Sequence, residues 1–167
     1  MDTLWLVGMM GAGKSTVGPL VAKRLGRGFV DLDGAIATAA GRPISELFAA
    51  AGEAGFRRRE AAMLAEAAGL EVVVACGGGI VMDPANVALM RRTGMVAWLA
   101  APAAVLAARV GDGAGRPMAG ETGAEVAALL ASREAACATA AHWRVVTAGR
   151  TPAEIAEEVV RRWSESG

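Results

Sequence analysis

Short apolar runs alternate along the chain with longer segments in which apolar residues recur at helical spacing. The short runs predict strands at Thr3–Val7, Gly28–Asp31, Val72–Ala75, Met95–Leu99 and Arg144–Thr147. Most of these runs lack period-two alternation, so we expect both faces of the sheet to be buried. The longer segments predict helices at about 14–25, 33–40, 44–50, 53–68, 84–93, 102–109, 123–140 and 152–164. This alternation indicates an α/β fold with a parallel sheet and a ligand site at the carboxyl ends of its strands.

Proline and glycine divide these elements. Prolines at positions 84, 102 and 152 are typical of a first helical turn, and glycines at 26, 41, 69 and 94 are typical of helix ends. Residues 111–120 are rich in glycine and lack apolar periodicity, which predicts a mobile loop. We find no linker long enough to separate two domains, and residues 1–167 are expected to form one domain.

Composition excludes several classes of protein. The 167 residues are 54% hydrophobic, with 17 basic and 17 acidic side chains and a net charge of zero. This balance argues against a surface built for nucleic acid or for an anionic membrane. Cys76 and Cys137 form no disulfide framework, and no apolar stretch reaches the roughly 20 residues of a membrane span. We expect a cytoplasmic monomer that acts on small molecules.

The strongest motif follows the first predicted strand. Gly8-Met9-Met10-Gly11-Ala12-Gly13-Lys14-Ser15 matches the pattern G-x-x-x-x-G-K-[ST] and opens a predicted helix. Glycines let backbone N–H groups surround phosphates, and the helix N-terminus adds positive potential. Lys14 is expected to reach the β- and γ-phosphates, and the Ser15 hydroxyl to bind Mg²⁺. The chain therefore binds a nucleoside triphosphate, while the absence of an Asn-Lys-x-Asp sequence argues against guanine specificity.

Two carboxylates end the second predicted strand. Asp31 and Asp33 are spaced i, i+2, so on a strand they share one face. One is expected to assist Mg²⁺, directly or through water, and the other to orient an acceptor hydroxyl or to act as its base. The alternative is a polar strand end with a helix N-cap at Asp33.

Two further segments indicate an anionic acceptor. Arg57, Arg58 and Arg59 lie near a predicted helix start, where a cation is unfavourable unless an anion is bound; the alternative is a solvated charged face. The triple glycine at residues 77–79 follows a buried strand directly, and glycines there let a ligand approach the backbone.

Together these motifs resemble the shikimate kinase family over almost the whole chain. Besides the phosphate loop and Asp31-Leu32-Asp33, the resemblance rests on the run from Gly41 to Glu60, on the triple glycine, and on Arg116-Pro117-Met118 and Arg133. It implies an α/β three-layer sandwich of the P-loop kinase type, with a five-stranded parallel sheet in the order 2-3-1-4-5. It also implies a substrate-binding segment at about 33–61 and a lid at about 111–122.

The family's activity is the ATP-dependent phosphorylation of the shikimate 3-hydroxyl, a step toward aromatic amino acids. The resemblance implies that Asp33, Lys14 and Arg116 are catalytic and that Ser15 and Asp31 hold Mg²⁺. The acceptor would contact Asp33, Arg57, Gly78, Gly79, Arg133, Phe48, Phe56 and Glu60. The nucleotide would contact Gly11, Ala12, Gly13, Lys14, Ser15, Thr16, Arg109, Arg116, Arg150 and Pro152.

Two positions depart from the family pattern. The Pro-Leu-Tyr that usually follows the helix arginine is absent, since Arg133 is followed by Glu134-Ala135-Ala136-Cys137, and a usual glutamate is Ala37. The first departure predicts a looser helix around Arg133. Two alternatives therefore stay open: a kinase for another small hydroxylated acid or sugar, and a non-catalytic nucleotide-binding relative.

Overall fold

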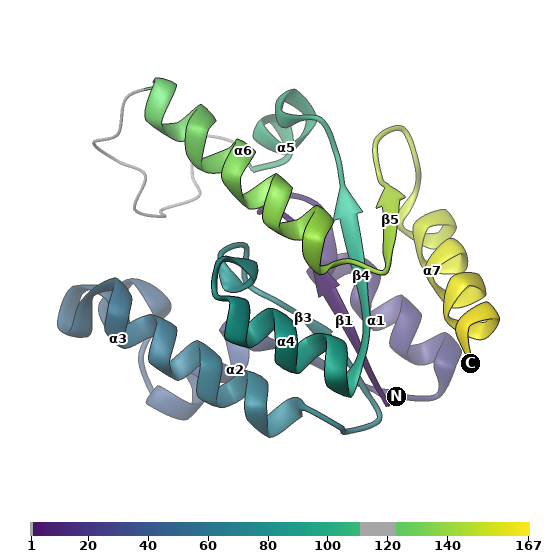
Figure 1. The fold of residues 1–167 in the computed structure, drawn as a ribbon, viewed down its shortest axis with the longest axis horizontal. Helices are drawn as coiled ribbons and strands as arrows, with labels where there is room; N and C mark the ends of the chain where they lie inside the picture. The colour runs from purple at the N-terminus through teal and green to yellow at the C-terminus, as the bar shows by residue number, and fades with distance from the viewer. Residues whose placement is uncertain (1, 111–122) are drawn as a thin grey trace.

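The computed structural model describes residues 2–110 and 123–167. Five parallel strands form one sheet in the order β2-β3-β1-β4-β5, which confirms the predicted order (Figure 1). The central strand β1 lies between β3 and β4, so that Trp5 is in register with Val74 on one side and Val96 on the other. The strands are β1 (Thr3–Val7), β2 (Gly28–Asp31), β3 (Val72–Ala75), β4 (Gly94–Ala100) and β5 (Trp143–Val146).

Helices cover both faces of this sheet. The described helices are α1 (Lys14–Leu25), α2 (Leu32–Ala40), α3 (Ile44–Ala67), η1 (Ile80–Met82), α4 (Pro84–Thr93), α5 (Ala103–Val110), α6 (Gly123–Ala140) and α7 (Pro152–Ser166). Helices α1 and α7 lie side by side on one face, and α3 and α4 lie on the other (Figure 1). Among the described residues, no helix is both long and apolar enough for a membrane span.

The central strand explains why the sequence shows no alternation of apolar and polar residues. Leu4 and Leu6 pack in a buried cluster with residues of α1 and α7. Trp5 and Val7, which point to the opposite face, pack in a second cluster with residues of α3, α4 and α6. Both faces of β1 are therefore core, and each fully buried side chain of this kind stabilises the fold by about 1.5–3 kcal/mol.

Several predicted boundaries were wrong. The strand β5 begins and ends one residue before the predicted range, at Trp143 and Val146. Gly94 is the C-cap of α4, so the predicted helix end is confirmed; its φ of −174° is extended, and β4 begins there. The short 3₁₀-helix η1 follows the triple glycine and was not predicted, because three residues are too few to show a periodicity.

The break predicted near residues 51–52 is confirmed: two helical segments meet there across a kink. Helix α3 runs from Ile44 to Ala67, and only Gly52 departs from helical geometry, with φ 68° and ψ −177°. This region of backbone space is open essentially to glycine alone. The kink therefore depends on Gly52, and it turns the first part of α3 relative to the part that carries Arg57.

Candidate active site

The phosphate loop connects β1 to α1, as the motif predicted. Gly13 is the N-cap of α1 with φ 94°, a left-handed conformation that costs glycine little. Lys14 and Ser15 begin the helix, so that backbone N–H groups of its first turn point toward the loop. This arrangement favours an anion at the N-terminus of α1.

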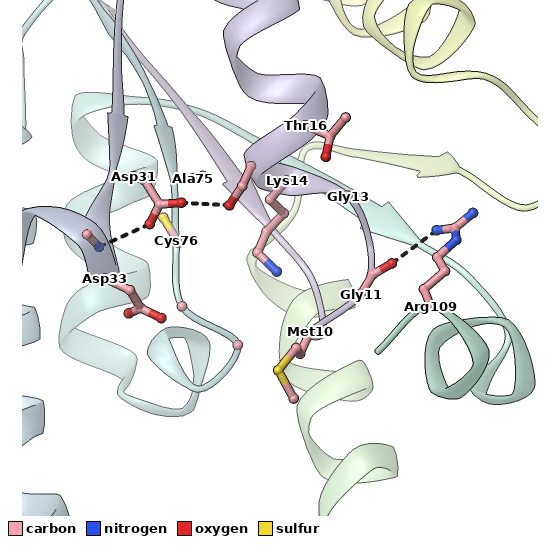
Figure 2. Close-up of a pocket in the computed structure, with 14 residues that line it drawn as sticks. Met10, Gly11, Gly13, Lys14, Thr16, Asp31, Asp33, Ala75, Cys76 and Arg109 are labelled. Carbon is pink, nitrogen blue, oxygen red and sulfur yellow. Dashed lines mark hydrogen bonds between the residues drawn. The ribbon is translucent and has the colours of Figure 1, made fainter. Parts of the chain in front are cut away.

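Lys14 folds back over the phosphate loop. Its Nζ donates hydrogen bonds to the carbonyl oxygens of Gly8, at 2.7 Å, and of Met9, at 2.9 Å. Figure 2 shows the ammonium group between Asp31 and Asp33 on one side and the loop at Gly11 on the other. The ammonium group is thus held over the cavity, where the phosphates of a bound nucleotide are expected.

The two predicted metal ligands lie in direct contact. The Ser15 hydroxyl donates a hydrogen bond to Asp31 Oδ2 at 2.6 Å, and Asp31 Oδ1 accepts one from the Gly34 backbone N–H at 3.2 Å (Figure 2). Asp31 is the N-cap of α2. An oxygen-only pair of this kind suits a hard cation such as Mg²⁺, with the phosphates of the nucleotide supplying further oxygens.

The predicted strand geometry of the acidic pair was wrong. Strand β2 ends at Asp31 and α2 begins at Leu32, so Asp33 lies in the first helical turn. The N-cap is Asp31, not Asp33 as the alternative interpretation held. The two carboxylates still line the same cavity, because the connection from β2 to α2 forms part of its wall.

One cavity of about 690 Å³ joins the phosphate loop to the acidic pair. Its volume suits a nucleotide phosphate group together with a small acceptor. The lining residues come from the phosphate loop, from α1, from the β2–α2 connection, from the end of β3 and from α5 (Figure 2). They are Met10, Gly11, Gly13, Lys14, Ser15, Thr16, Asp31, Asp33, Gly34, Ala75, Cys76, Gly77, Gly78 and Arg109.

Beside this cavity, Arg57 and Glu60 form an ion pair on α3. Arg57 Nη1 lies 2.7 Å from Glu60 Oε2, and Arg57 Nη2 lies 3.6 Å from Glu53 Oε1. Glu60 is fully buried, and burial raises the pKa of its carboxyl group while the Arg57 guanidinium lowers it again in part. Arg57 is 30% exposed, so one end of a largely buried pair faces outward.

Two aromatic rings support this arginine. Phe48 and Phe56 stack with ring centroids 4.5 Å apart, and the Arg57 guanidinium lies 5.5 Å from the centre of the Phe56 ring. Phe48 precedes the kink of α3 and Phe56 follows it, so the kink at Gly52 brings the two rings together. Such contacts hold the guanidinium in place and exclude water from one side of it.

The remaining residues predicted to contact the acceptor lie around the triple glycine. A Cβ atom added to Gly77 would lie 2.8 Å from Glu60 Oε1 and 3.0 Å from Asp33 Oδ1, and one added to Gly78 would lie 3.9 Å from Arg133 Nη1. Residues of α2, α3, α6 and the loop after β3 therefore meet at one place. The sequence motif indicated the triple glycine as a group and did not distinguish Gly77 from its neighbours.

The helix around Arg133 is intact despite its unusual sequence. Helix α6 continues to Ala140, and Cys137 and Ala140 are fully buried in the core. The Thr139 hydroxyl donates a hydrogen bond to the Ala135 carbonyl oxygen at 3.0 Å. The altered segment thus stays helical and packs against the core, while a looser helix around Arg133 stays a prediction.

Arg109 ties the phosphate loop to the loop after β5. Its Nη1 donates to the Gly11 carbonyl oxygen at 3.1 Å and to the Thr147 hydroxyl at 3.0 Å, and its Nη2 donates to the Thr147 carbonyl oxygen at 3.2 Å. Arg150 instead contacts Glu158 and the Glu154 carbonyl oxygen at the start of α7. Arg150 and Pro152 do not belong to the described cavity lining, and their nucleotide contacts stay a prediction.

Arg116 and the predicted lid at 111–122 lie outside the described residues. Cys76 lines the cavity, which was not predicted, and burial raises the pKa of its thiol, which disfavours the thiolate form. The buried Thr147 carried no sequence signal, since its side chain contacts Arg109 and Ala100, which are distant in the sequence.

Comparison with known proteins gives one family. The family model described as shikimate kinase matches residues 10–164. A curated shikimate kinase of Symbiobacterium thermophilum is 44% identical over 167 residues, which cover 97% of this chain and 96% of that protein. One of Nostoc punctiforme is 39% identical, covering 94% and 88%. The solved shikimate kinase of Acinetobacter baumannii in complex with shikimate has a TM-score of 0.92 at 30% identity, covering 99% and 94%.

Proposed function

We propose that this chain, which belongs to the shikimate kinase family, transfers the γ-phosphoryl group of ATP to the 3-hydroxyl of shikimate, giving shikimate 3-phosphate and ADP. One observation carries the proposal. A single cavity joins Lys14 of the phosphate loop to Asp33, and the Arg57–Glu60 pair lies against it. Lys14 would bind the phosphates there, Asp33 the acceptor hydroxyl and Arg57 the acceptor carboxylate.

The nucleotide half would hold ATP by its phosphates. Backbone N–H groups of Gly11, Ala12 and Gly13 and of the first turn of α1, with Ser15 and Thr16, would surround the phosphates. Lys14 would leave the Gly8 and Met9 carbonyl oxygens to contact the β- and γ-phosphates. Arg109 would border the adenine, with Arg150 and Pro152 as further predicted contacts.

Mg²⁺ is the expected partner of ATP, and Ser15 and Asp31 would hold it. Their oxygens lie 2.6 Å apart, so the two side chains already converge on one point. When bound, the ion supplies neutralising charge for the phosphate oxygens. Arg116 is proposed to supply further positive charge from the lid, and Lys14 would do so beside the phosphate loop.

The acceptor half would bind a hydroxylated carboxylic acid. Arg57 and Arg133 would hold the carboxylate, with Phe48, Phe56 and Glu60 shaping the pocket and Gly78 and Gly79 adding backbone contacts. Asp33 would take the proton of the 3-hydroxyl as its oxygen forms a bond to the γ-phosphorus. The bond between that phosphorus and the β–γ bridging oxygen breaks, and ADP leaves.

Release of ADP in the presence of ATP and shikimate tests the proposal. Wild-type protein is expected to turn over only when shikimate is present, and Asp33→Asn should lower kcat by about 10²–10⁴-fold. Arg59→Ala is the matched control for arginine loss on α3, since Arg59 is exposed, and its kinetics should match wild type. ATP binding without shikimate-dependent turnover would refute the proposal and favour a non-catalytic relative.

Two arginine variants test how the acceptor is held. Arg57→Ala and Arg133→Ala should each raise the KM for shikimate, because losing an ion-paired anchor costs about 2–5 kcal/mol, while the KM for ATP changes little. An unchanged KM for shikimate in both variants contradicts the two-arginine clamp. The cytoplasmic location and the monomeric state stay predictions that rest on the sequence.

A further inference from the structure

The three consecutive glycines after β3 are not equivalent, because the space that a side chain would need differs at each. Gly77, Gly78 and Gly79 follow Cys76 directly and face the acceptor half of the site. None has the positive φ that favours glycine, so any residue could adopt their backbone conformations. A requirement for glycine here must be steric.

At Gly79, the guanidinium of Arg57 occupies the place of the missing side chain. A Cβ atom on Gly79 would lie 2.8 Å from both Cζ and Nη1 of Arg57, well inside van der Waals contact. Arg57 is held where it is, since Nη1 lies 2.7 Å from Glu60 Oε2 and the guanidinium faces the Phe56 ring. A methyl group at position 79 would therefore displace the acceptor arginine.

At Gly77, two carboxylates occupy the corresponding space. A Cβ atom there would lie 2.8 Å from Glu60 Oε1 and 3.0 Å from Asp33 Oδ1. Glu60 is fully buried and its other oxygen is held by Arg57, so it has no room to withdraw. Asp33 is fixed in the first turn of α2. A methyl group at position 77 would push apart the expected base and the partner of Arg57.

Gly78 provides the contrast. The atoms nearest to a Cβ at this position are the Gly8 carbonyl oxygen and the Met10 nitrogen, at 3.8 Å, and Arg133 Nη1, at 3.9 Å. These are ordinary van der Waals distances, so a methyl group fits.

We propose that Gly77 and Gly79 are positioning residues of the acceptor site, each leaving the space that a functional side chain occupies: Gly79 for Arg57, and Gly77 for Asp33 and Glu60. The identity of the acceptor rests on the proposed function, whereas the steric relationship does not. The acceptor site is thus set by missing side chains on one loop as much as by the charged groups on α2 and α3.

A stability experiment tests Gly77 without any substrate. Thermal unfolding of Gly77→Ala should show a midpoint lowered by about 3–9 °C, as expected for overpacking in a chain of this size. Gly78→Ala should shift the midpoint by less than about 1 °C. In a Glu60→Ala background, Gly77→Ala should lower the midpoint by less than half as much. Equal shifts for Gly77→Ala and Gly78→Ala, or no relief from Glu60→Ala, would overturn the assignment of Gly77.

Steady-state kinetics test Gly79 in a double-mutant cycle with Arg57. Gly79→Ala should raise the KM for shikimate about tenfold or more and leave the KM for ATP within about twofold, because only the acceptor arginine moves. In an Arg57→Ala background, the same change should alter the KM for shikimate by less than about twofold. Equal losses in both backgrounds would overturn the role of Gly79, since its effect would then not pass through Arg57. If wild type does not use shikimate, the proposed function fails, and the unfolding experiment still decides the steric claim for Gly77.

Discussion

Removing Arg57 should destabilise the fold in a way that depends on pH. In the native protein Arg57 Nη1 lies 2.7 Å from Glu60 Oε2, and Glu60 is fully buried. Breaking a buried ion pair costs about 3–5 kcal/mol and an exposed pair costs at most about 1 kcal/mol. Because Arg57 is 30% exposed, we expect Arg57→Ala to cost about 2–3 kcal/mol at neutral pH.

The pH dependence follows from Glu60. Burial raises the pKa of its carboxyl group, and Arg57 is the largest influence that lowers it. In Arg57→Ala that pKa should rise further. The folded state then holds a proton that the unfolded state releases, so the free energy of unfolding falls as pH rises toward the new pKa. The destabilisation caused by Arg57→Ala should therefore be small in acid, where Glu60 is protonated. It should grow as pH rises from the folded-state pKa of Glu60 in the wild type to its higher pKa in Arg57→Ala.

Urea unfolding at several pH values between about 5 and 8 measures this effect, with the urea dependence checked for constancy. Arg57→Ala/Glu60→Gln should lose most of the pH dependence, because the amide needs no ionic partner. Arg59→Ala is the matched control and should behave as wild type, since Arg59 is exposed on the same helix. An equal loss of stability in Arg57→Ala at every pH would refute this role of Glu60. So would a pH dependence of stability in the double variant as large as in Arg57→Ala.

Three further predictions concern the frame of the site. Gly52→Ala should cost about 1–3 kcal/mol of unfolding free energy because of its φ of 68° alone, since an added Cβ meets no atom within 4 Å; chemical denaturation measures this, and wild-type stability would contradict it. His142 Nδ1 accepts a hydrogen bond from the Val96 N–H at 2.9 Å, and burial lowers the pKa of the imidazole. The stabilising contribution of His142 is therefore present above about pH 6.5 and is lost as pH falls through the folded-state pKa. His142→Gln should remove that part of the acid sensitivity, and an unchanged pH profile of stability would count against this role. Asp31→Ala removes the N-cap of α2 and should cost about 1 kcal/mol, together with a higher Mg²⁺ requirement for turnover; an unaltered Mg²⁺ requirement would argue against Asp31 as a metal ligand.

Much of the nucleotide half could be predicted because it is local in the sequence. Gly13, Lys14 and Ser15 are consecutive, and glycine conformations and a helix N-terminus follow from the residue types themselves. For the acidic pair, Asp31 and Asp33, the residues were predicted correctly but their geometry was wrong. Period-two reasoning placed both on a strand, whereas the Asp31 side chain caps α2 and ends the strand two residues before Asp33.

In the acceptor half of the site, the residues could be predicted only through the family resemblance. The pattern around Arg57, Glu60 and Arg133 could be recognised, but nothing in the spacing showed that Glu60 is fully buried. Nor did it show that Asp33 and Glu60 meet at Gly77, because these contacts join segments far apart in the chain.

By itself, the sequence determined the order of strands and helices, the phosphate loop and the residue types of the site, because these depend on local backbone preferences and on the period of apolar residues. The tertiary structure alone decided which glycine gives space to which side chain, since Gly77, Gly78 and Gly79 are identical in the sequence and differ only in what lies 2.8 Å or 3.8 Å away. It also decided that Arg109 joins the phosphate loop to Thr147. Such relationships come from the packing of distant segments, in which a single methyl group changes whether two side chains fit.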